Sequence, residues 1–231
     1  MWLTPEEWVV LGLSARVAVC CVATVAIPGI ACGWLLARIR FPGKSLVDAV
    51  LHAPLVMPPV VTGYLLLMLL GRNGVLGGVM HRYFGFSLAF TWQAAVIASA
   101  VMGFPLMVRA VRIAMEMTDP KLEAAARSLG ASPLRTFLTI TLPLARPGII
   151  TGLVLAFARS LGEFGATIVF AGNIQGETRT LPLAVYNYIQ VPGGDAAAFR
   201  LVLVSILLSL GALVASEVMS RRYHHPERAA G

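Results

Sequence analysis

Two opposite charges inside a long apolar stretch, Arg159 and Glu163, are the residues best placed to do chemistry. They are four residues apart, so on a helix they share one face. An isolated charge at the centre of a bilayer costs at least about 2.5–3.5 kcal/mol, so each side chain should face the other, a partner helix or water. With Ser160 and Gly162 between them, they are candidates for a gate or the inner mouth of a pathway. The alternative interpretation is a neutralised pair that only fixes helix packing.

The other reactive residue types form no constellation. Cys20, Cys21 and Cys32 lie within the first apolar run without metal-ligand spacing, so we expect small buried hydrophobic residues there. Gly43-Lys44-Ser45 is similar to the end of a phosphate-binding loop, but Arg38 stands where that loop requires its first glycine. The sequence therefore predicts no catalytic residue, no metal, no cofactor and no ATP site in this chain.

The composition is typical of a membrane protein. Of the 231 residues, 58% are apolar and only 13% are charged, about half the charged fraction of an ordinary soluble domain. The net charge of +7 does not indicate a nucleic-acid partner, because the basic residues lie between apolar runs and not along one face. Lipid must therefore be the solvent for much of the surface.

Five apolar stretches are long enough to cross a bilayer as helices, which predicts an all-α, polytopic bundle in a single domain, 1–231. They cover residues 17–37, 47–70, 86–108, 148–171 and 201–218. Pro54, Pro58 and Pro59 lie close together in the second stretch, so we expect that helix to be kinked or broken. In transporters such breaks often line a pathway, although a simple packing kink fits equally well.

Basic residues predict the orientation. The connections 38–45 and 109–147 and the tail after residue 220 hold twelve Lys and Arg, whereas 71–85 and 172–198 hold three. By the positive-inside rule the N-terminus of this multi-pass protein lies outside and the C-terminus in the cytoplasm, which in an inner membrane makes the N-terminus periplasmic. An odd number of spans independently agrees. Glu6 and Glu7 replace the basic region that a signal peptide would have, so we expect the first helix to be retained.

The longest connection on the cytoplasmic side, residues 117–147, carries start and stop signals for two short helices. Asp119-Pro120 is a helix start signal, strong helix formers follow to Leu129, and Gly130 is placed to end the helix in a left-handed conformation. Ser132-Pro133 repeats the start signal, and a second helix is expected over 134–142, ending before Pro143. Such a compact pair of short helices favours docking to a partner protein. An amphipathic helix lying on the membrane is the alternative.

This connection resembles the EAA loop of ABC importer permeases: alanines precede Gly130, and Ile140 and Leu142-Pro143 follow at the family's spacing. In that family the loop forms coupling helices seated in a groove of the ATP-hydrolysing subunit. The family's glutamate position falls on Ala124, so Glu123 lies one residue early and its carboxylate is rotated by about 100° on a helix. The resemblance implies a MetI-like, type I fold and the following coupling residues: Glu123, Ala124, Ala125, Ala126, Gly130, Ile140, Leu142 and Pro143.

A second resemblance concerns the substrate. ARSLGEFGAT at 158–167, AGNI at 171–174 and ETRTLP at 177–182 are similar to permeases for molybdate and sulfate, and QVPGGD at 190–195 looks most like the molybdate permeases. The resemblance implies a permease that works as a homodimer with two cytoplasmic ATP-binding subunits and a periplasmic molybdate-binding protein. Some relatives carry one more N-terminal helix than this sequence.

Other functions stay open at this point. Within the same family the substrate can be sulfate, thiosulfate or tungstate in place of molybdate. A stand-alone secondary transporter would normally carry an internal repeat or several intramembrane carboxylates, and neither is evident. A membrane-embedded enzyme would need a reactive constellation facing one leaflet.

Overall fold

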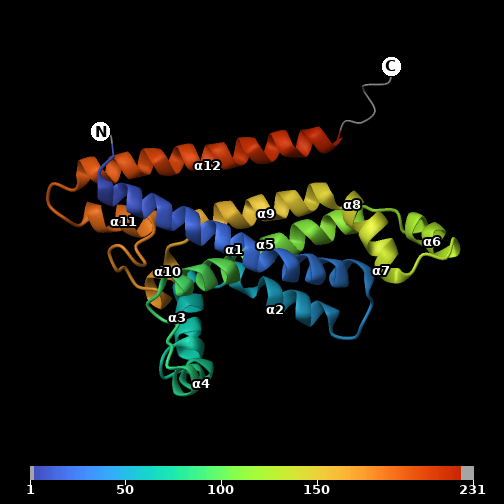
Figure 1. The fold of residues 1–231 in the computed structure, drawn as a ribbon, viewed down its shortest axis with the longest axis horizontal. Helices are drawn as coiled ribbons and strands as arrows, with labels where there is room; N and C mark the ends of the chain where they lie inside the picture. Colours follow the sequence, from blue (N-terminus) through green and yellow to red (C-terminus); the bar gives the residue numbers. More distant parts are fainter. Residues whose placement is uncertain (1–2, 225–231) are drawn as a thin grey trace.

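The backbone of residues 3–224 and the side chains of residues 3–212 and 214 are described by a computed structural model (Figure 1). The described part of the chain is helical. Its elements are α1 (Pro5–Arg38), α2 (Lys44–Val56), α3 (Pro59–Leu70), α4 (Val75–Phe84), α5 (Trp92–Glu116), α6 (Pro120–Ser128), α7 (Pro133–Thr136), the π-helix η1 (Phe137–Thr141), α8 (Leu142–Leu144), α9 (Arg146–Leu161), α10 (Gly165–Phe170), α11 (Leu181–Ile189) and α12 (Asp195–His224).

Helix α5 is the centre of the bundle, packed between α1 and α9. Its buried positions Met107, Val111 and Met115 follow helical spacing and form one hydrophobic cluster with residues of α1 and α9. Glycines on α9 allow the close approach to α5, because a Cβ added at Gly152 would lie 2.6 Å from the Met107 sulfur. Cys21 is fully buried in this cluster, as predicted, whereas Cys20 and Cys32 are only half-buried.

The helix lengths agree with a membrane protein of up to five spans. Helices α1 and α5 and residues 195–212 of α12 are each long and apolar enough to cross a bilayer. The segments α2–α3 and Pro133–Leu144 with α9 would each add one span as a bent pair. Helix α1 begins at Pro5, twelve residues before the predicted stretch, because Thr4 and Glu7 form a capping box there. Helix α5 begins at Trp92, six residues after the predicted start, and continues past the predicted end to Glu116.

Two predicted spans are interrupted. The second breaks between α2 and α3 with a bend of 112°, at the proline pair Pro58-Pro59, which confirms the predicted break. The fourth was predicted as a continuous helix over 148–171, and this was wrong: α9 ends at Leu161 and α10 begins at Gly165. Gly162 lowers the conformational cost of ending α9 at this point. The Glu163 side chain then accepts a hydrogen bond from the first turn of α10.

The bundle has two distinct ends. Helices α6 to α8 form one end, and α11 with the start of α1 forms the other (Figure 1). Helix α12 runs along the bundle and ends on the same side as α6, so α1 begins and α12 ends at opposite ends (Figure 1). The hairpin of α3 and α4 projects sideways from the bundle (Figure 1).

Candidate coupling surface and intramembrane ion pair

Helix α6 has the start and stop that the sequence predicted. The Asp119 side chain accepts a hydrogen bond of 2.9 Å from the Lys121 amide, and Pro120 occupies the first turn. At the other end Gly130 has φ of +87°, in the left-handed region, and its amide donates to the Arg127 carbonyl. Glycine adopts this conformation at little cost, whereas a β-branched residue is strongly disfavoured there, so Gly130 fixes the direction in which the chain leaves α6.

The second short helix differs from the prediction. It begins as expected, with the Ser132 hydroxyl accepting from the Arg135 amide and Pro133 in the first turn. It does not end before Pro143, however, but widens into the π-helix η1 and continues as α8 through that proline. Pro143 has no N–H to donate to a carbonyl in the preceding helical turn. The wider π-helical turn before it lets the helix continue without that hydrogen bond.

Together α6 and α7 form what we call the α6–α7 knob, residues 120–136. No residue of α6 is buried, and its Leu122, Ala125 and Leu129 are exposed on one face at helical spacing. Leu129 is 89% exposed and Leu134 on α7 is 67% exposed. Of the three predicted alanines, Ala124 and Ala125 are exposed and Ala126 is half-buried. The knob therefore presents small and apolar side chains that its own chain does not cover.

The leucines of the knob were not among the predicted site residues. The spacing of seven between Leu122 and Leu129, on a helix with few other large apolar residues, was the available signal. Exposed apolar patches of this kind mark surfaces for protein partners or membranes.

Glu123 points back into its own chain. Its Oε1 accepts from Arg38 Nη2 at 2.8 Å and Nε at 3.1 Å, and from the Thr141 hydroxyl at 2.9 Å. Arg38 also donates to the Thr118 carbonyl at 3.1 Å. This α1–α6 clasp, made of Arg38, Glu123 and Thr141, ties the knob to the end of α1 and to η1. Sequence reasoning had not linked these residues, because Arg38 is 85 positions away from Glu123.

The remaining predicted coupling residues attach the knob to the bundle. Ile140, Leu142 and Pro143 are half-buried, and Leu142 packs against the cluster that contains Met115 of α5. Phe137 of η1 also packs there, with its ring in edge contact with Trp34 of α1 at 5.8 Å between centroids. The knob therefore exposes its leucines and alanines. It is attached to the bundle by the apolar contacts of Phe137 and Leu142 and by the polar α1–α6 clasp.

The intramembrane charges pair as predicted. Arg159 Nη1 lies 2.6 Å from Glu163 Oε2. Glu163 is 1% exposed and Arg159 26% exposed. Glu163 lies past the end of α9, and its Oε1 accepts a hydrogen bond of 2.8 Å from the Ala166 amide, so it also caps α10. Ser160 is buried whereas Gly162 is exposed, so these four residues do not face one common space.

Comparison with known proteins places these features in a family. Residues 29–225 match the family described as "Binding-protein-dependent transport system inner membrane component". The chain is 57% identical over 221 residues to the molybdenum transport system permease protein ModB of Escherichia coli (strain K12), covering 96% of each chain. It is 58% identical over 189 residues to ModB of Haemophilus influenzae, covering 82% of each. It is 37% identical over 183 residues to the sulfate transport system permease protein CysT of Salmonella typhimurium, covering 78% of this chain and 66% of that protein.

Solved structures show the same fold. An inward-facing methionine ABC transporter, MetNI, matches with a TM-score of 0.71 at 18% identity, covering 95% of this chain and 98% of that one. A bacterial ABC transporter that imports alginate matches with a TM-score of 0.73 at 15% identity, covering 95% and 80%. These structures confirm the predicted all-α, MetI-like fold, and the family match disfavours both a stand-alone transporter and a membrane enzyme. The chain belongs to the family of inner-membrane components of binding-protein-dependent transport systems.

Proposed function

We propose that this chain is the membrane-spanning permease subunit of an ATP-driven importer and that its substrate is molybdate. The observation that carries the proposal is the identity of 57%, over 96% of both chains, to a permease of a molybdenum transport system. The match to a sulfate permease is weaker and covers less of both chains, so sulfate is the competing substrate that an experiment must address.

The distribution of basic residues supports one orientation of the permease in the membrane. Segments 38–45 and 109–147 hold nine Lys and Arg, against three in 71–85 and 172–198, which favours a cytoplasmic α6–α7 knob and a periplasmic segment 172–198. Cysteine labelling from outside intact cells tests this. A cysteine at position 179 should react with an impermeant reagent and one at 121 should not, and the reverse pattern would contradict the orientation.

The knob is the proposed docking surface for a cytoplasmic ATP-binding subunit. Its support is the uncovered stripe of Leu122, Ala125 and Leu129, together with Leu134, in a family whose members work with such subunits. Leucine anchors on a short rigid helix fit a groove on a partner, as in other helix-in-groove interfaces. Glu123 is engaged by Arg38, so we assign it to positioning the knob and not to binding the partner.

The proposed assembly has two copies of this chain, two ATP-binding subunits and a periplasmic molybdate-binding protein. Family membership supports the binding protein and the ATPase as partners. Energy would enter through the ATPase, because the chain's Gly43-Lys44-Ser45 turn lacks the first glycine of a phosphate-binding loop. We place Arg159 and Glu163 at a gate, since Glu163 lies in the break between α9 and α10 and Arg159 lies in the last turn of α9. Packing of the two helices is the alternative role of the pair.

Uptake measurements test the substrate. Deleting the gene should abolish high-affinity uptake of labelled molybdate and leave sulfate uptake intact, and the gene on a plasmid should restore it. Tungstate added as a competitor reports how strictly the system separates the two ions. Loss of sulfate uptake with unchanged molybdate uptake would overturn the assignment.

A further inference from the structure

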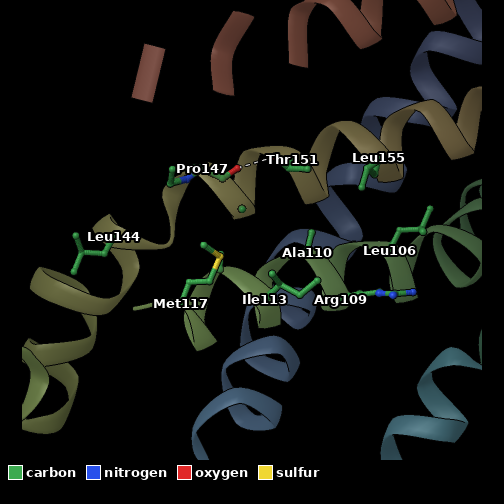
Figure 2. A pocket seen from close by; sticks show the side chains of 11 residues that line it. Leu106, Arg109, Ala110, Ile113, Met117, Leu144, Pro147, Thr151 and Leu155 are labelled. Atoms are coloured by element: carbon green, nitrogen blue, oxygen red, sulfur yellow. Dashed lines mark hydrogen bonds between the residues drawn. The ribbon is translucent and has the colours of Figure 1, made fainter. Parts of the chain in front are cut away.

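A groove between α5 and α9 opens near the α6 end of the bundle (Figure 2). It has a volume of about 460 Å³. It is lined by Leu106, Arg109 and Ile113 of α5 and by the following Met117, which continue one helical spacing. They lie on the face opposite the buried Met107, Val108 and Val111. Since α1 packs against the buried face of α5, the groove lies on the other side of α5, where α9 forms its second wall.

Among the residues whose side chains the structure describes, Arg109 is the one charged residue that lines this groove. Its side chain is exposed and extends along α5 away from Met117 (Figure 2). Seven residues separate it from Glu116 at the end of α5, so the charge lies roughly 10 Å inside that end at 1.5 Å per residue. The other polar side chain of the lining, Thr151, already donates its hydroxyl proton to the Pro147 carbonyl at 2.9 Å.

Arg109 differs from the four arginines of the bundle that form ion pairs. Arg38, Arg112, Arg159 and Arg200 each contact a carboxylate at 2.6–3.0 Å. Within residues 3–212, no carboxylate lies within salt-bridge distance of Arg109, and no hydrogen bond satisfies its guanidinium. Because the Arg109 side chain is exposed, water or an anion can reach its guanidinium between the apolar walls of the groove. The nearby Arg112, only one turn away, is instead neutralised by Asp48 and Glu116.

We propose that Arg109 is a transient binding site for the transported oxyanion on the α6 side of the pathway. This inference rests on the proposed function, since it takes the cargo to be an anion. A single guanidinium offers parallel N–H donors that match an oxyanion, and the apolar walls of the groove supply no second charge to trap it. Conduction needs a site that attracts the ion yet releases it, and one unpaired arginine in an open groove meets both conditions.

The experiment uses the complete complex with its ATPase and binding protein in proteoliposomes. We expect Arg109→Gln to lower the maximal rate of molybdate uptake about tenfold or more, because a charged cleft raises local ion concentration by at least that factor. The concentration of loaded binding protein at half-maximal rate and the ATPase activity should be unchanged. Arg109→Lys should keep a large part of the rate. Arg40→Gln removes a positive charge outside the groove and should transport normally.

Chemical restoration of the charge separates binding from structure. In a protein whose Cys20, Cys21 and Cys32 are replaced, Arg109→Cys should regain uptake after reaction with a positively charged thiol reagent, and should not after reaction with a negative one of similar size. Molybdate should slow the modification. Normal uptake by Arg109→Gln, or equal rescue by both reagents, would overturn the proposal. The proposal would also be overturned if Arg109→Gln changed only how the stability of the complex depends on anionic lipid, because Arg109 would then bind a lipid phosphate. If the unmodified complex takes up no molybdate, the proposed function fails instead.

Discussion

Helix α1 is held at its two ends by ion pairs of different character. At its start, Glu7 is 1% exposed and binds Arg200 of α12 through contacts of 2.7 and 3.1 Å, while Arg200 is 27% exposed. At its end, Arg38 and Glu123 of the α1–α6 clasp are both 15% exposed. The first pair joins two long helices, whereas the second holds a short helix that buries no residue of its own.

The difference shows how rigidity is distributed. Glu7 is buried, also completes a capping box with Thr4, and sits beside a cluster in which α1, α11 and α12 pack together. The knob is instead positioned by hydrogen-bond geometry and a small apolar contact. An element held in this way shifts at low energetic cost, which suits a surface that transmits movement from a partner.

The largest effect on stability is expected from Arg200→Ala. It leaves the Glu7 carboxylate buried without its cation, which should lower the free energy of unfolding by about 3 kcal/mol, the lower end for a broken buried pair because Arg200 is partly exposed. Glu7→Gln should cost less, because the arginine left behind is partly exposed and the amide oxygen still accepts from the Thr4 amide. Thermal unfolding of the purified permease measures both. Equal costs for the two variants would contradict the stated role of burial.

The pair at the α9–α10 break should show the same asymmetry in transport. Arg159→Ala leaves the buried Glu163 uncompensated and should reduce uptake strongly, whereas Glu163→Ala leaves an arginine that reaches water. The double variant should recover part of the loss in folded protein. Uptake per assembled complex and membrane abundance are the readouts. If the double variant is no better than Arg159→Ala in either, the two residues do not act as a pair.

A smaller effect on stability, but a specific effect on coupling, is expected at the clasp. Glu123→Gln weakens the contact with Arg38, and its cost in unfolding free energy should stay at about 1 kcal/mol. Molybdate transported per ATP hydrolysed should nevertheless fall severalfold, because α6 loses its fixed position. Glu116→Gln is the matched control, since it removes a more exposed carboxylate at the same end of the bundle. An unchanged transport-to-ATP ratio in Glu123→Gln would remove the clasp from the coupling account.

Local signals predicted much of this molecule. The caps at Asp119 and Ser132, the left-handed Gly130 and the break at Pro58-Pro59 all depend on a few adjacent residues, and the structure confirms each. The Arg159–Glu163 contact could also be predicted, because its partners are four residues apart on a helix.

Features that depend on distant residues were missed. The clasp joins positions 38 and 123, and the pair at the start of α1 joins positions 7 and 200, so neither has a local pattern. The continuation of the helix through Pro143 was missed because proline was taken to end it, whereas a π-helix accommodates it. The break after Leu161 was also missed although its signal is local: Glu163 caps α10 through the amide of Ala166, three residues on, within an otherwise apolar sequence.

The central claim is that the α6–α7 knob couples this permease to an ATP-binding subunit, and Gly130 tests it most directly. A Cβ at Gly130 meets no atom within 4 Å, so a substitution acts only through the φ of +87°. Gly130→Val should strain the turn and displace α6, whereas Gly130→Asn tolerates the left-handed conformation and serves as control. The measurement is co-purification of the ATP-binding subunit with each variant at equal membrane abundance. The account predicts that the valine variant loses the subunit and its uptake while the asparagine variant keeps both. A valine variant that retains the subunit and transports normally would contradict it.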